Sequence, residues 1–230
     1  MQSRSAAAPV RRCIVSILVK GMLIIGVLLL AAFAYAIFSV LTLEKPGYRV
    51  VLESGDIEYR QYEPYLVSET LIEQARDYKA AGNEGFRRLF RYISGANTGQ
   101  TKISMTVPVA QTESSQKIAM TVPVQQTESA QGWRVAFMLP GEYTLETAPQ
   151  PTDERVKIRA VPGRLTAVLR YSGRWTEDNY AEKRGALLQA LEQASVTPMG
   201  EVQSAQYAPP STPPFLRRNE VLVDVDRLPE

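Results

Sequence analysis

The stretch Lys102–Gln131, KISMTVPVAQTESSQKIAMTVPVQQTESAQ, contains one 15-residue segment twice in succession. Twelve of the 15 positions are identical between the copies Lys102–Gln116 and Lys117–Gln131. In each copy apolar residues alternate with other residues, and this period of two is typical of a β-strand with one buried face. The alternating residues are Ile103, Met105, Val107 and Val109 in the first copy, and Ile118, Met120, Val122 and Val124 in the second. The repeat therefore predicts two related strands in a β-rich fold.

Each copy also carries one proline, Pro108 or Pro123. Proline has no N–H group to donate to a sheet, so it is found at sheet edges, at bulges or at strand ends. We therefore expect both prolines to lie at such positions.

The N-terminal part of the chain differs from the rest. Gly21–Leu43 is a run of 23 residues without a charge, and four cations but no acid precede it: Arg4, Arg11, Arg12 and Lys20. A run of this length can cross a hydrocarbon layer of about 30 Å. The excess of cations on one side predicts that residues 1–20 are cytoplasmic, that residues 21–43 span the membrane, and that residues 44–230 lie outside the cytoplasm.

A cleaved signal peptide is the alternative interpretation of this segment. Ala34-Tyr35-Ala36 resembles a cleavage site, although the apolar run continues beyond it to Leu43. The single cysteine, Cys13, lies ahead of the apolar run, so there is no lipobox. Both interpretations export the domain; the anchor places it at the cell membrane as a single-pass periplasmic domain, and cleavage would make it secreted.

The exported part, Glu44–Glu230, has 187 residues, which suits one domain with a single core. Without the four N-terminal cations it has 22 basic and 24 acidic residues, a net charge of −2. This balance does not indicate a nucleic-acid partner. Histidine is absent from the whole chain, which excludes the usual catalytic triads and the commonest zinc and haem ligand. Any catalysis would therefore have to rest on carboxylate, lysine, serine or tyrosine side chains.

The order of predicted elements is similar in the two halves of the domain. In the first half we expect strands, then a helix capped by Asn83 and ended by Gly95, then more strands. In the second half we expect two strands, a helix capped by Thr176, a proline-rich loop and a last strand. The predicted strands are 48–52, 57–61, 66–74, the two repeat copies, 133–139, 156–160, 165–171 and 220–226. Two amphipathic helices with a mostly antiparallel sheet indicate an α+β fold, and the repeated order indicates a pseudo-twofold relation between the halves.

Four strings in this order resemble the SOUL, or haem-binding protein, family. They are Y-R-Q-Y at 59–62, F-R-Y-I-S-G-A-N at 90–97, the K-I-x-M-T-V-P-V strand, and the closing P-P at 209–210 with R-R-N-E-V at 217–221. Their order and spacing cover nearly all of Tyr48–Asp226. The duplicated strand departs from the single-copy animal members, and we expect it to add a hairpin.

The resemblance implies a distorted, mostly antiparallel β-barrel of about eight strands with two helices, similar to bacterial effector-binding domains. It also implies binding of haem and related tetrapyrroles. Some members use a histidine ligand; in others the porphyrin lies on the first helix, held by apolar contacts and by basic groups near its propionates. Because this chain has no histidine, the resemblance implies the second mode, with haem or a porphyrin bound non-covalently.

On the first helix, Phe86, Leu89 and Phe90 match the porphyrin-facing residues of the family, although some must face the sheet instead. Arg87 and Arg91 are four residues apart and share one helix face, and a guanidinium suits a propionate carboxylate. The alternative for both arginines is a solvated helix face.

Arg217 belongs to the closing string, which either forms a ligand rim opposite the helix or fixes the proline-rich loop onto the last strand. Methionine and tyrosine side chains that could bind iron are expected to be packing residues: Met105, Met120, Met138, Tyr92 and Tyr171.

The function predicted from these features is binding of a tetrapyrrole, as a carrier, buffer or sensor, by a domain held at the membrane by its N-terminal helix. Three alternatives remain at this point. The domain could bind another small amphipathic ligand, it could be a protein-interaction domain that uses the extra hairpin, or it could degrade or dechelate haem, which the lack of histidine disfavours.

Overall fold

The computed structural model describes residues 20–27, 43–115 and 131–229. Contacts divide the chain into two units, Met1–Leu43 and Glu44–Glu230. In the first unit, residues 20–27 are helical. Among the described residues no helix is both long enough and apolar enough to cross a membrane. Most of the predicted anchor, residues 28–42, lies outside the described residues, so the anchor stays a prediction.

The second unit is built on a nine-stranded sheet whose neighbouring strands are all antiparallel. Its strands are β1 (Tyr48–Ser54), β2 (Ile57–Tyr62), β3 (Tyr65–Ile72), β4 (Val109–Ser115), β5 (Gln131–Met138), β6 (Val156–Val161), β7 (Arg164–Tyr171), β8 (Gln203–Gln206) and β9 (Asn219–Asp224). The helices are α2 (Tyr78–Ile93), α3 (Glu177–Gln193) and the short 3₁₀ helix η1 (Pro214–Leu216). The predicted α+β class and antiparallel sheet are confirmed.

The sheet is a curled half-barrel. Its strand order is β1-β2-β7-β9-β8-β4-β5-β3-β6, so β1 and β6 form the two edges and do not pair with each other. The expected barrel is therefore open within the described residues. β8 was not expected, because its sequence QSAQ has neither β-branched nor aromatic residues.

The topology repeats itself across the domain. The succession β3-α2-β4-β5 recurs as β7-α3-β8-β9, and the two halves meet where β4 pairs with β8. β2 precedes the first half and pairs with β7 of the second half. In the same way, β6 precedes the second half and pairs with β3 of the first half. Apart from β1, the strand order is thus the same from either end, which is the connectivity of two equivalent halves around a pseudo-twofold axis.

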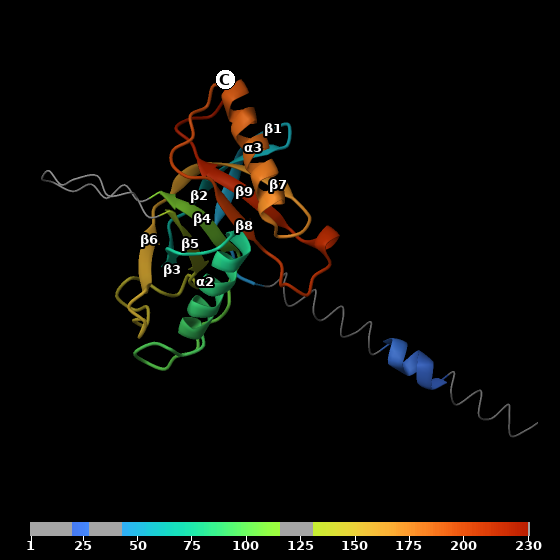
Figure 1. The fold of residues 1–230 in the computed structure, drawn as a ribbon, viewed down its shortest axis with the longest axis vertical. Helices are drawn as coiled ribbons and strands as arrows, with labels where there is room; N and C mark the ends of the chain where they lie inside the picture. Colours follow the sequence, from blue (N-terminus) through green and yellow to red (C-terminus); the bar gives the residue numbers. More distant parts are fainter. Residues whose placement is uncertain (1–19, 28–42, 116–130, 230) are drawn as a thin grey trace, which may run out of the picture. The chain divides into compact units, whose positions relative to one another are not determined.

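Both helices lie on the same face of the sheet, in front of it in Figure 1. Helix α2 packs on β3, β5 and β6, and α3 packs on β7 and β9. Each covers its own buried cluster. The cluster under α2 includes Leu89, Tyr92, Val135 and Phe137, and the cluster under α3 includes Leu187, Leu191, Val221 and Val223.

Helix α2 begins earlier than predicted. The side chain of Asp77 accepts a hydrogen bond from the N–H of Ala80 at 2.7 Å and is the N-cap, so the assignment of Asn83 as N-cap was wrong. Gly82 and Gly85 weaken the helical signal of the first turns, because glycine has a low helix propensity. The predicted end is confirmed: Gly95 follows the helix with a φ of 117°, which suits glycine. The predicted cap of α3, Thr176, is also confirmed, since its side chain accepts from the N–H of Asn179.

The first repeat copy forms a strand later than the alternation indicated. Residues 101–108 pair with no strand, and β4 begins at Val109 directly after Pro108, so the predicted strand over Ile103–Val109 was wrong while the placement of the proline at a strand end was right. Ile103 and Val107 are nevertheless buried. Their N–H groups donate to the backbone oxygens of Ile93 and Glu44 in place of a neighbouring strand. Residues 116–130, almost all of the second copy, lie outside the described residues.

Candidate ligand-binding site

The outer side of α2 carries an aromatic surface made by Phe86 and Phe90. Their rings stack with centroids 5.8 Å apart and planes 10° from parallel. Phe86 also contacts Phe137 edge to face at 5.2 Å, which links it to the buried cluster under α2. Phe90, by contrast, is 48% exposed. The inner ring is therefore supported by the core and the outer ring is open to a ligand.

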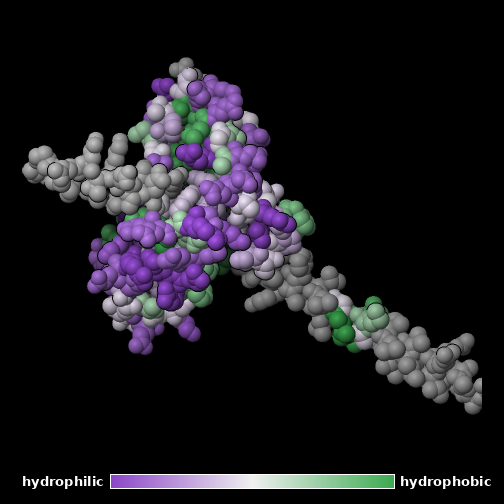
Figure 2. Space-filling view, in the orientation of Figure 1, coloured by the Kyte–Doolittle hydropathy of each residue, from purple (hydrophilic) through white to green (hydrophobic). Residues whose placement is uncertain are grey.

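An open hollow of about 620 Å³, which we call the α2 hollow, lies at this aromatic surface. It is lined by Glu84, Phe86, Arg87, Arg88, Phe90, Arg91 and Arg155. Four of these residues carry a guanidinium and one carries a carboxylate, so the hollow has an excess of positive charge. Figure 2 shows mostly hydrophilic surface over α2 and β6. Such an arrangement suits a flat apolar ligand with anionic substituents.

A second hollow of about 510 Å³ adjoins the first one. It shares Glu84, Arg88 and Arg155 with the α2 hollow, and it is completed by the end of β3 and the two residues beyond it, Leu71, Ile72, Glu73 and Gln74. The three shared residues therefore lie between the α2 hollow, which is aromatic and basic, and the second hollow, which also contains the carboxylate of Glu73.

Arg87 and Arg91 are both exposed and line the α2 hollow on either side of Phe90 in the sequence. Arg88 has a different position, because its side chain is only 7% exposed. Its Nη1 donates to Thr70 Oγ1 at 2.7 Å and to the backbone oxygen of Leu71 at 3.2 Å, and its Nη2 donates to Glu84 Oε1 at 2.6 Å. Arg88 thus fastens α2 to β3 and still contributes charge to the floor of the hollow.

Arg155 reaches the hollow from the segment before β6. It is held by a forked ion pair, in which its Nε and Nη2 donate to the two carboxylate oxygens of Asp153 at 2.8 and 2.7 Å. The hydrogen bond from Arg155 lowers the pKa of Asp153 to about 2, and the charge of Arg88 acts in the same direction. The pair therefore stays ionised across the neutral range and keeps the guanidinium of Arg155 beside the hollow.

Two predicted site residues do not belong to this hollow. Leu89 is fully buried in the cluster under α2, so its inclusion among the ligand contacts is corrected. Arg217 lines a separate hollow with η1 and the β1–β2 turn, which shares no residue with the α2 hollow. Its Nε and Nη2 donate to the backbone oxygens of Thr212 and Pro210, and its guanidinium lies 4.3 Å from the Trp175 ring centroid.

The closing string has the structural role, which was one of the two interpretations of its sequence. Glu220 is fully buried and accepts from Arg60 at 2.9 and 3.1 Å, from Arg218 at 2.7 Å, and from the Tyr207 hydroxyl at 2.9 Å. Together with the bonds of Arg217, this network fixes the proline-rich loop to β9.

The side chains considered as iron ligands are packing residues in the described part of the chain. Met138 is buried, and Met105 packs on the cluster under α2. The Tyr92 hydroxyl donates to the backbone oxygen of Pro149, and Tyr171 packs on the cluster under α3. Met120 lies outside the described residues. Among those that are described, no three acidic, cysteine or histidine side chains are placed to hold a metal ion.

Sequence reasoning missed Glu84 and Arg155 as site residues. The four-residue spacing of Glu84 and Arg88 is a signal of an ion pair on a helix, and it was available in the sequence. No comparable signal existed for Arg155, because it comes near α2 only through the pairing of β6 with β3.

Three comparisons with known proteins place the chain. The family model described as SOUL heme-binding protein matches residues 43–224. Mouse Heme-binding protein 1 is 28% identical over 139 residues, which cover 60% of this chain and 68% of the mouse protein. The C-terminal domain of EcmrR has a similar fold, with a TM-score of 0.54 and 10% identity over 79% of this chain and 99% of that domain. EcmrR in a DNA complex has the same TM-score at 9% identity, over 98% of this chain and 74% of EcmrR. The likeness to EcmrR shows the fold alone, whereas the family match covers most of the chain, and the chain therefore belongs to the SOUL heme-binding protein family.

Proposed function

We propose that this domain binds haem or a related tetrapyrrole in the α2 hollow, without a histidine ligand, as a carrier, buffer or sensor and not as an enzyme. The observation that carries the proposal is the exposed ring of Phe90, stacked on Phe86 and surrounded by the guanidinium groups of Arg87, Arg91 and Arg155. The macrocycle would lie on the aromatic surface, and its propionates would pair with the arginines.

The two kinds of contact contribute differently. Burial of apolar surface yields about 25 cal/mol per Å², so 200 Å² of macrocycle contributes about 5 kcal/mol. Each exposed guanidinium–carboxylate pair adds up to about 1 kcal/mol. Since association itself costs several kcal/mol, the net binding free energy is smaller than the sum of these contributions, and we expect the aromatic contact to dominate it.

The iron contributes little in this proposal, because none of the residues lining the α2 hollow is a histidine, methionine, cysteine or tyrosine. We expect haem and iron-free protoporphyrin to bind with affinities within about tenfold of each other. A hundredfold preference for haem would contradict the proposal, because it would require a protein ligand to the iron.

The test is a titration of the fragment 44–230, a compact unit that contains all nine strands, both long helices and both buried clusters. The Soret band reports haem binding, and tryptophan quenching reports the porphyrin. Phe90→Ala should weaken both ligands at least tenfold. The matched control is Phe215→Ala, because Phe215 is 75% exposed and lies outside the α2 hollow. Equal affinities for the two variants would reject the α2 hollow as the site.

We also propose that the N-terminal segment holds the domain at the outer side of the cytoplasmic membrane. The support is the uncharged run of residues 21–43 preceded only by cations. A carrier held in this way would present its ligand site close to a membrane, where apolar tetrapyrroles partition.

A further inference from the structure

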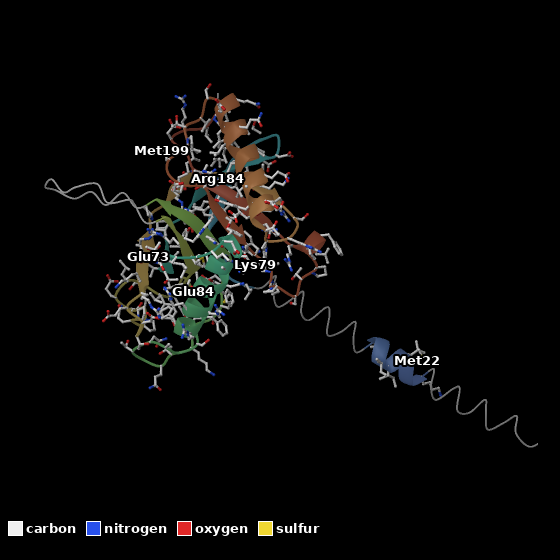
Figure 3. The ribbon with its side chains drawn as sticks, in the orientation of Figure 1. Met22, Glu73, Lys79, Glu84, Arg184 and Met199 are labelled. Carbon is white, nitrogen blue, oxygen red and sulfur yellow. The ribbon has the colours of Figure 1, made fainter. Side chains whose placement is uncertain are left out.

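Glu84 is the carboxylate among the residues that line the α2 hollow, where the other charged groups are four guanidiniums. It is 48% exposed and its Oε1 lies 2.6 Å from Nη2 of Arg88. Figure 3 shows Glu84 on the same side of α2 as Glu73, and both residues line the adjoining hollow. A carboxylate of the protein thus already lies where the carboxylate of a ligand would find its partners.

Glu84 interacts electrostatically with two arginines that line the α2 hollow, Arg88 and Arg155. Arg155 is close enough that the negative charge of Glu84 contributes to raising the pKa of Arg155, although the bond with Asp153 is the larger cause. Arg88 has two further acceptors on β3, so it is held in place whether or not Glu84 is charged. A substitution that removes the charge of Glu84 therefore leaves Arg88 in place in the hollow.

We propose that Glu84 is a built-in competitor for the ligand's carboxylates and so determines how much negative charge the α2 hollow accepts. This inference rests on the proposed function. Glu84 neutralises part of the positive charge that attracts an anionic ligand, and it repels any carboxylate that approaches Arg88 or Arg155. The hollow thereby discriminates against ligands with many carboxylates, while neutral flat ligands do not experience the competition.

The substitution Glu84→Gln separates charge from structure. Glutamine has the same shape and keeps an oxygen that accepts from Arg88, so the contact between α2 and β3 is preserved while one negative charge is removed. A unit charge a few ångströms away in a partly solvated site changes affinity by roughly fivefold per ligand carboxylate that approaches it.

The experiment compares three porphyrins that share the aromatic ring: the dimethyl ester of protoporphyrin without carboxylates, protoporphyrin with two, and coproporphyrin with four. Fragment 44–230 and its Glu84→Gln variant are titrated with each ligand by tryptophan quenching. We expect an unchanged affinity for the ester, a gain of roughly fivefold for protoporphyrin and a larger gain for coproporphyrin. The gains should shrink at 1 M salt, where the Debye length is about 3 Å.

The matched control is Glu182→Gln, an exposed glutamate on α3 outside the α2 hollow, which should leave all three affinities unchanged. Equal gains for all three ligands, no gain, or a loss would overturn the inference. If the wild-type domain binds the porphyrins and Phe90→Ala weakens them while Glu84→Gln changes nothing, only this inference fails. If the wild type binds none of the porphyrins, the proposed function fails as well.

Discussion

At the scale of single residues, the buried carboxylate of Glu220 is held by three side chains. It lies between Arg60, whose side chain is 1% exposed, and Arg218, and it accepts a further hydrogen bond from Tyr207. Burial alone would raise the pKa of Glu220, but hydrogen bonds and attraction from Arg60 and Arg218 outweigh it and lower the pKa below its ordinary value of 4.5. The ionised form of Glu220 is therefore the form that the fold stabilises.

The substitution Glu220→Gln should lower the free energy of unfolding by about 3 kcal/mol at pH 7, because it removes the buried counter-charge that Arg60 and Arg218 share and leaves Arg60 with only the partly exposed Glu58. The matched control is Glu69→Gln. Glu69 also pairs with two arginines, Arg134 and Arg159, but these are 40% and 45% exposed, so we expect a loss below about 1 kcal/mol. Urea unfolding followed by tryptophan fluorescence measures both, and equal losses would show that burial of the partners is unimportant.

The same residue predicts a dependence on pH. Since the pKa of Glu220 is lower in the folded than in the unfolded state, its stabilising contribution is fully present above about pH 4.5 and is lost as the pH falls through the folded-state pKa. Glu220→Gln should flatten the decline of stability below pH 4.5 relative to the wild type.

At the scale of elements, the two helices carry glycines with opposite surroundings. A Cβ at Gly85 of α2 would overlap the side chain of Val135 on β5, whereas a Cβ at Gly185 of α3 would meet nothing within 4 Å. Gly85 thus lets α2 lie close to the sheet, and this close approach places Phe86 against Phe137. Gly185 has no such role on the exposed side of α3.

We predict that Gly85→Ala destabilises the domain by about 1–3 kcal/mol, because the overlap with Val135 outweighs the better helix propensity of alanine. Gly185→Ala should instead stabilise it by about 0.5–1 kcal/mol through propensity alone. Thermal unfolding of the two variants measures the difference. Shifts of the midpoint in the same direction would show that α2 can move away from β5 without cost.

At the scale of the whole molecule, two equivalent halves share one sheet, and each contributes a helix with its own core. The α2 hollow belongs to one half only, because its two stacked phenylalanines lie on α2 and α3 contains no phenylalanine. The pseudo-twofold describes the scaffold and not the site.

The proposed anchoring also belongs to this scale. The full chain should sediment with membranes and resist extraction by high salt or alkaline carbonate, because an apolar span is held by its hydrocarbon contacts and not by charge. The fragment 44–230 should remain in the soluble fraction. Release of the full chain by salt would contradict the anchor, and a shortened product in the soluble fraction would favour signal-peptide cleavage.

Much of the scaffold was predictable because it depends on local chemistry. The cap at Thr176, the end of α2 at Gly95 and the strand limit at Pro108 each follow from the backbone preferences of one residue, and the strings around Tyr59 and Arg217 carry the family. A local pattern also gave a wrong prediction, at Ile103–Val109. Ile103 and Val107 are buried there, but their N–H groups donate to backbone oxygens outside any neighbouring strand.

The candidate site was predictable for the aromatic and basic residues that lie close together on α2, and not for the residue that another element contributes. Phe86, Phe90, Arg87 and Arg91 lie within two turns of one helix, so their proximity is local and can be read from their spacing. Arg155 joins them only because β6 pairs with β3, and Leu89 is excluded only because that turn of α2 faces β5. The amino-acid order thus settles what each segment prefers to be, whereas long-range strand pairing alone settles which distant charges meet, since that proximity depends on the energy of the complete sheet and is encoded in no single segment.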